Sequence, residues 1–209
     1  MILLERFFKP KTQKNDPQAR LKRVQNLPFG DPQLAEFAQQ DADSGVRRAA
    51  VNRLTDLQLL QRISQTDTSL PIKETAVARF RALLAGTAIP PPTLQERLTR
   101  VSSLDDELTR FLVHHAKEPE LRLAALERIE DETFQTRIAI DDNNANVRLA
   151  ALAHVHKAAH LEEIVKHSRN RDKRLYRVTR NGWINSRRAT TGGTGRGLMP
   201  GNGKSQLGR

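Results

Sequence analysis

Histidines are the residues whose type and spacing in this chain could support metal chemistry. His114 and His115 are adjacent, and His154, His156 and His160 follow one another closely. The four-residue step from His156 to His160 would place both imidazoles on one face of a helix, a spacing that zinc sites use. However, a helix break is expected at residues 157–159, and no third ligand lies nearby in the sequence. We therefore expect solvated histidines, with no bound metal and no other cofactor.

The tripeptide Gly203-Lys204-Ser205 is similar to the end of a phosphate-binding loop. That motif needs an earlier glycine, and the required position holds Leu198. Acidic residues occur mainly at expected helix starts, where capping accounts for them without a catalytic role. We therefore expect no catalytic residues and a protein that is not an enzyme.

The formal net charge of +11 is unevenly distributed along the chain. Residues 173–209 contain nine Lys and Arg residues and no Asp or Glu, which leaves 26 basic against 24 acidic residues, or +2, for residues 1–172. A nearly neutral body is poorly suited to neutralising many phosphates. Nucleic-acid binding is therefore the alternative hypothesis for this chain and not the first.

The chain has no cysteine, which excludes disulfides and thiolate chemistry. Its first ten residues contain too short an apolar stretch for a secretory signal, and no later stretch approaches a membrane-spanning length. We expect a cytoplasmic protein without stable membrane insertion. No feature of the sequence indicates an oligomeric state.

A basic residue followed four residues later by a branched aliphatic residue recurs along the chain at intervals of 24 to 27 residues. The pairs are Arg20/Val24, Arg47/Val51, Lys73/Val77, Arg97/Val101, Arg122/Leu126, Arg148/Leu152 and Arg174/Val178. We count positions from this basic residue as position 0. Such a period predicts an array of repeated helical units rather than a single folded core.

Each unit is expected to be a hairpin of two helices. Apolar residues at positions −1, +3, +4 and +7 form one stripe of a helix, with alanine common at position +3. Aspartates 16 or 17 residues earlier, Asp31, Asp56, Asp105 and Asp131, are predicted to cap a preceding helix. Asp41, Asp67 and Asp142 lie at position −6, and we expect them to cap the second helix and to pair with the basic residue of their own unit.

The segments Val46-Arg-Arg-Ala-Ala-Val-Asn-Arg-Leu54 and Val147-Arg-Leu-Ala-Ala-Leu-Ala-His-Val155 resemble the short HEAT-like repeats, also called PBS-lyase-type repeats. The resemblance covers residues 1–180 and implies an all-α fold, an α-α superhelix or solenoid of about seven short hairpins. The segments at residues 4–10, 16–21 and 166–177 also resemble the N-terminal region of the bacterial family domain of unknown function 349. The His-Glu dipeptides of HEAT-like di-iron enzymes are absent from the sequence.

The linker at residues 85–92 contains consecutive prolines and is expected to interrupt the array. We predict a first sub-array at residues 1–88, a second at 89–180 that includes the start of a further unit, and a Gly-rich basic tail at 181–209 that is disordered. The first ten residues are expected to dock on the first unit as a cap.

The predicted function is that of a non-catalytic scaffold that presents a concave helical surface to a protein partner. The residues expected to contact that partner lie between the apolar stripes of the second helices, and are Arg48, Asn52, Arg53, Glu127, Arg128 and His154. In the nucleic-acid alternative the contacts are Arg20, Lys22, Arg23, Arg47, Arg48 and Arg53. A HEAT-like enzyme, resembling a bilin lyase or a DNA glycosylase, is the third hypothesis.

Overall fold

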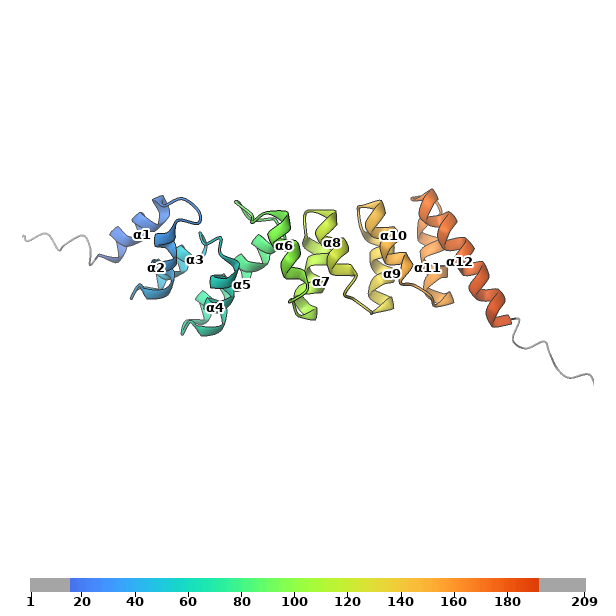
Figure 1. The fold of residues 1–209 in the computed structure, drawn as a ribbon, viewed down its shortest axis with the longest axis horizontal. Coiled ribbons are helices and arrows are strands. Elements are labelled where there is room, and N and C mark those ends of the chain that lie inside the picture. The colour runs from blue at the N-terminus through green and yellow to red at the C-terminus, as the bar shows by residue number, and fades with distance from the viewer. Residues whose placement is uncertain (1–15, 192–209) are drawn as a thin grey trace, which may run out of the picture. The chain divides into compact units, whose positions relative to one another are not determined.

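The structure, a computed structural model, describes residues 16–191, and its side chains are described as far as Arg187. All regular secondary structure in this range is α-helical, which confirms the all-α prediction. The helices are α1 (Pro17–Asn26), α2 (Pro32–Gln40), α3 (Ser44–Val51), α4 (Leu57–Thr66), α5 (Leu70–Leu84), α6 (Leu94–Val101), α7 (Asp106–His115), α8 (Pro119–Leu126), α9 (Glu132–Asp141), α10 (Ala145–Ala153), α11 (Ala158–Ser168) and α12 (Lys173–Thr191) (Figure 1). The expected N-terminal cap and residues 192–209 lie outside the described residues.

Most helices pair with the next one along the chain into a hairpin, as Figure 1 shows. The hairpins in the described range are α2 with α3, α4 with α5, α7 with α8, α9 with α10, and α11 with α12. Second helices also pack against second helices of neighbouring hairpins, α3 against both α1 and α5, α8 against α6, and α12 against α10. The hairpins joined by these contacts therefore share an apolar stripe.

The chain divides into two compact units, Met1–Arg128 and Ile129–Arg209. This boundary differs from the predicted one at residue 88, because the linker at residues 85–92 is held within the first unit. Arg97 of α6 donates to the carbonyl oxygen of Pro92 at 3.2 Å, and the Lys117 amide donates to that of Ala85 at 2.9 Å. The linker replaces a first helix for α6, as its prolines predicted.

Aspartate side chains begin four of the first helices, as predicted. Asp31 accepts a hydrogen bond from the amide of Gln33 at 2.9 Å, and Asp105 from that of Leu108 at 2.8 Å. Asp56 and Asp131 cap α4 and α9 in the same way. A side-chain oxygen satisfies amide groups that have no partner inside the helix, which is why an Asp in this place fixes where the helix begins.

The apolar stripe of the second helices is buried where the repeat predicts it. The position +3 alanines, Ala50, Ala76, Ala125 and Ala151, have no exposed surface, and the position +4 residues Val24, Val51, Val101, Leu126 and Leu152 are also buried. Val77 departs from the pattern with 37% of its surface exposed. It belongs to the repeat before the linker, where the following unit lacks its first helix.

The last repeat differs from the prediction in register. Val178, expected in the stripe, is 48% exposed, whereas Leu175 and Thr179 are buried. The stripe of α12 therefore runs through Leu175, Thr179 and the half-buried Trp183. The helix continues to Thr191, which corrects the prediction of a disordered tail for residues 181–191. A helix tolerates an interior glycine such as Gly182 at a cost of about 1 kcal/mol.

Candidate functional site

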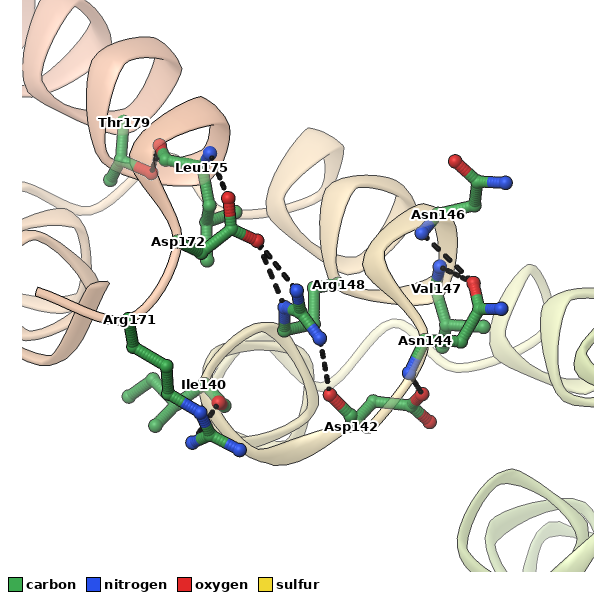
Figure 2. A network of polar contacts seen from close by, with 10 residues as sticks. All are labelled: Ile140, Asp142, Asn144, Asn146, Val147, Arg148, Arg171, Asp172, Leu175 and Thr179. Atoms are coloured by element: carbon green, nitrogen blue, oxygen red, sulfur yellow. Dashed lines mark hydrogen bonds and ion pairs between the residues drawn. The ribbon is translucent and has the colours of Figure 1, made fainter. Parts of the chain in front are cut away.

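Arg148 links two successive hairpin turns in the second unit (Figure 2). Its guanidinium donates to the carbonyl oxygen of Asp142 at 2.8 Å, in the turn that precedes its own helix. It also donates to Oδ2 of Asp172, in the next turn, at 2.6 and 3.2 Å. Asp172 Oδ1 meanwhile accepts from the amide of Leu175 at 2.9 Å and so caps α12. One arginine therefore fixes the spacing between two neighbouring repeats.

The same bridge recurs in the first unit, and we call the whole set the arginine–carboxylate ladder. Its ion pairs are Arg20–Asp41 at 2.7 Å, Arg47–Asp67 at 3.4 Å, Arg97–Glu118 at 2.7 Å and Arg148–Asp172 at 2.6 Å. As in the second unit, Arg47 also donates to the carbonyl oxygen of Asp41 at 2.9 Å. Each carboxylate thus belongs to the turn that follows the arginine, one repeat later in the sequence.

This geometry corrects the predicted role of Asp41, Asp67 and Asp142. The carboxylates of Asp41 and Asp67 pair with the arginine of the preceding repeat, not with the basic residue of their own unit. Nor are the three aspartates the N-caps of the second helices, because each accepts from the amide two residues later, at 2.7 to 2.8 Å, before the helix begins. The N-cap residues are instead Asp43, Ser69 and Asn144.

The ladder carboxylates of Asp41, Glu118 and Asp172 are held in their charged form. Hydrogen bonds from Arg97 lower the pKa of Glu118, against the opposing effect of burial. The amide of Leu175, followed by Arg148, likewise lowers the pKa of Asp172. Burial acts to raise the pKa of Asp41, but the hydrogen bonds from Arg20 and from the amide of Asp43 outweigh it and the pKa is lowered. Groups that stay ionised at neutral pH are poor general acids, so the ladder supports a structural role.

A second set of arginines, at position +6, bridges the ends of neighbouring second helices. Arg79 Nε donates to the carbonyl oxygen of Leu54 at 3.0 Å, and Arg128 donates to that of Leu104 at 2.9 Å. Arg53 bonds the carbonyl oxygen of Leu27 in the same way. These carbonyl groups follow a helix end, where the helix itself supplies no donor, so the arginines satisfy them. We call this set the helix-end arginines.

These contacts separate the sequence-predicted site residues into two groups. Arg48, Asn52, Glu127 and His154 are exposed, as a partner-binding role requires. Arg53 and Arg128 are helix-end arginines and hold repeats together. Of the residues named for nucleic-acid binding, Lys22, Arg23 and Arg48 are exposed, whereas Arg20, Arg47 and Arg53 are engaged in the two sets of bridges.

A run of half-exposed leucines was missed in the sequence. Leu98, Leu123 and Leu149 all stand at position +1 of their second helices, and each is partly open to solvent. Their spacing of 25 and 26 residues was visible in the sequence. The sequence pattern was used only to predict the buried stripe, which does not include position +1. In the first unit α6 packs against α8, which places Leu98 and Leu123 at corresponding positions of neighbouring helices.

A groove of about 570 Å³ in the first unit is lined by both polar and apolar side chains. Phe29 and the prolines Pro90, Pro91 and Pro92 form much of it. The guanidinium carbon of Arg53 lies 4.4 Å from the centre of the Phe29 ring, and that of Arg79 lies 5.4 Å from it. Burial, and then the charge of Arg53, lower the pKa of Arg79. The linker thus contributes an ordered surface to this unit.

The histidines do not gather around a common centre. His156 lies in the turn before α11 and His160 within that helix, as the expected helix break predicted. His160 Nδ1 lies 3.4 Å from Glu132 Oε1, and the same carboxylate oxygen accepts from the amide of His156 at 2.8 Å. Among the described residues no cluster of three or more His, Asp or Glu could hold a metal ion. No helix in the described part of the chain is long and apolar enough to cross a bilayer.

Comparison of the sequence with models of protein families, with curated proteins and with solved structures finds no match.

Proposed function

We propose that this chain is a non-catalytic scaffold, a HEAT-like helical solenoid that binds a protein partner along its second helices. The support for the solenoid is the recurrence of hairpins at the repeat spacing, together with the packing of α3 on α1 and α5. The resemblance to short HEAT-like repeats and to domain of unknown function 349 belongs to the same proposal. Repeated hairpins of this kind create extended surfaces suited to elongated partners.

The observation that supports the proposal is that some side chains of each second helix bind neighbouring repeats while others remain exposed. The repeated arginines are occupied by carboxylates and carbonyl groups of neighbouring repeats. Outside α12, positions +1 and +5 are instead at least partly open to solvent, and their side chains vary among the repeats, although leucine recurs at position +1 of α6, α8 and α10. They hold Arg48 and Asn52 in α3 and at its end, and Leu98 and Ser102 at the corresponding places of α6. A rigid frame with a variable exposed stripe is suited to recognition rather than to chemistry.

Leu98 and Leu123 are the residues of this stripe that we expect to contribute most in the first unit. Both are large and apolar, and both keep solvent-accessible surface in the middle of a rigid helix. Burial of such side chains by a partner yields about 25 cal/mol per Å² of apolar surface removed from water. A few well-placed apolar anchors commonly dominate the energy of a protein interface.

The experiment is affinity purification of the tagged full chain, followed by quantitative binding of the co-purified protein. The Leu98→Asp/Leu123→Asp variant is expected to bind at least about tenfold more weakly, since loss of even one anchor costs about 1.4 kcal/mol or more. The matched control is Gln58→Asp/Gln61→Asp, which places two carboxylates on exposed positions of the first helix α4. Failure to recover a specific partner, or equal binding by both variants, contradicts the proposal.

Nucleic-acid binding is the second candidate, because α12 contains six Lys and Arg residues and no Asp or Glu. Arg174, Arg177 and Arg180 of this helix are exposed. Binding of a fluorescent duplex to the full chain at several salt concentrations tests it. An affinity that falls steeply with salt, and falls further in an Arg174→Glu/Arg177→Glu variant, supports this candidate.

A further inference from the structure

An apolar groove of about 430 Å³ runs along α12 in the second unit, facing the end of α10 and the start of α11. Leu149, Leu152 and Leu161 form its aliphatic wall on the side of α10 and α11. Val178 and Gly182 line it from α12. The groove is preformed, because its walls belong to helices that pack directly against one another.

Gly182 stands where three other repeats carry a helix-end arginine. In those repeats the arginine lies three positions after a buried small residue. It lies seven positions after a buried large aliphatic residue. The corresponding sets are Val46, Ala50 and Arg53; Ile72, Ala76 and Arg79; Leu121, Ala125 and Arg128; and Leu175, Thr179 and Gly182. The position that carries an arginine in those three repeats therefore holds a glycine in α12, and Gly182 lines the groove.

No residue that the structure describes requires a glycine at this place. A Cβ atom added to Gly182 would meet no atom within 4 Å, so close packing does not exclude a side chain. The residue lies within helix α12, where glycine is about 1 kcal/mol less favourable than alanine. Next to it Val178, which also lines the groove, exposes 48% of its surface, so the apolar lining continues onto the exposed face of α12. Both features indicate a surface completed by something outside the described residues.

The charge around the groove indicates what completes it. Arg174, Val178 and Gly182 follow one another at four-residue steps, so they share one face of α12. Arg174 and Arg177 are exposed, and the structure pairs neither with a carboxylate of the described residues. No Asp or Glu follows Asp172 in the sequence to neutralise them. An apolar recess beside uncompensated guanidinium groups matches an acidic ligand that also carries a large apolar side chain.

We propose that this groove binds an acidic amphipathic helix of a protein partner, whose large apolar side chain enters the space beside Gly182. Carboxylates of the same helix lie along Arg174 and Arg177. The proposal deepens the scaffold function and rests on it, since it names one partner chemistry and one place in the array. A nucleic acid fits less well, because aliphatic walls of leucine and valine offer nothing to a sugar-phosphate chain.

The test uses the full 209-residue chain and a fluorescein-labelled helical peptide of Glu, Ala and Leu with leucines on one face. A second peptide has the leucines replaced by serine and keeps every Glu. The decisive variant is Gly182→Arg, which installs the residue of the other repeats and fills the groove while adding a positive charge. Attraction by charge alone would then strengthen binding, whereas occupation of the groove would weaken it.

We expect the leucine peptide to bind the unmodified chain at least about tenfold more tightly than the serine peptide, and Gly182→Arg to abolish most of that difference. Gly182→Ala is the matched control, because it supports the helix without filling the groove and should bind within about twofold of the unmodified chain. Thermal unfolding of Gly182→Arg at or above the temperature of the unmodified chain shows that the variant is folded.

Four results would overturn the proposal. Equal binding of the two peptides, or tighter binding by Gly182→Arg, would reduce the groove to a charged surface. A DNA duplex that binds more tightly than either peptide and is unaffected by Gly182→Arg would assign α12 to nucleic acid. Peptide binding that appears only when residues 192–209 are removed would show that the chain fills its own groove. The Leu98→Asp/Leu123→Asp variant should bind the peptide normally, so failure of the scaffold surface and failure of the groove are separable.

Discussion

Arg97 and Glu118 form a bidentate ion pair, with two parallel hydrogen bonds of 2.7 and 2.8 Å between the guanidinium and the carboxylate. Only 3% of the Arg97 side chain is exposed, against 29% for Glu118. The same guanidinium donates to the carbonyl oxygen of Pro92 at 3.2 Å. This pair therefore joins α6, the linker and the turn before α8 at the place where the repeat lacks its first helix.

Replacement of Glu118 by alanine is expected to lower the free energy of unfolding by about 3 kcal/mol, because it leaves a buried guanidinium without its counter-charge. Urea denaturation of the full chain measures this. Glu107→Ala is the control, since Glu107 is 78% exposed and its pair with Arg81 should contribute less than about 1 kcal/mol. Similar losses for both variants would show that the Arg97–Glu118 pair contributes no more to the free energy of unfolding than an exposed ion pair.

Gly86→Ala should destabilise the chain by about 1 to 3 kcal/mol. Gly86 has φ of 74°, in the left-handed region, and a Cβ atom there would lie 2.4 Å from Nη1 of Arg97 and 2.8 Å from Oε2 of Glu118. Gly182→Ala provides the opposite case in helix α12, where the same change should stabilise by up to about 1 kcal/mol. Thermal melts of the two variants should therefore shift in opposite directions.

The stability of the chain should decrease below about pH 4. Asp41, Glu118 and Asp172 have lowered pKa values in the folded protein, so their stabilising contribution is complete above the unfolded pKa and is lost as the pH falls through the folded pKa. Thermal midpoints between pH 8 and pH 2 measure the effect. In Asp172→Asn the thermal midpoint should fall less between neutral and acidic pH. A midpoint that rises on acidification would contradict a stabilising role for the ladder carboxylates.

Arg128→Met should cost about 1 to 2 kcal/mol, because the carbonyl oxygen of Leu104 and the hydroxyl of Thr109 both lose a charged donor. Methionine keeps much of the aliphatic stem, so the loss reports the hydrogen bonds rather than the packing. Arg48→Met is the control at an exposed position and should change stability by less than about 0.5 kcal/mol. If the two substitutions have equal effects, the helix-end contact of Arg128 is not stabilising.

Local signals predicted the hairpins well. Asp31 and Asp131 cap the helices that follow them, and Ala50, Ala125 and Ala151 are fully buried at position +3. These features depend on residues within one or two helical turns, where side-chain type and spacing act directly on the backbone. The same local pattern failed at Val178, because which face of α12 is buried depends on the helices it packs against.

The surfaces were harder to predict than the helices. Arg53 and Arg128 were expected only to contact a partner. Arg128 is exposed and Arg53 partly exposed, yet both bond carbonyl groups that lie one repeat earlier in the chain. The groove beside Gly182 could not be predicted either, because residues of three different helices line it. The sequence shows that α12 has glycine where three other repeats have arginine, but the groove beside that glycine depends on how α10 and α11 pack against α12.

The sequence by itself determined that the chain folds into short helices at a regular period, because capping and apolar spacing are local properties. The partner of each repeated charge was decided only by the tertiary structure. Arg47 lies six residues after Asp41, yet its ion pair is with Asp67, because the next hairpin turn comes back beside it. Ion pairs and grooves form between repeats, and their geometry exists only once neighbouring hairpins have packed.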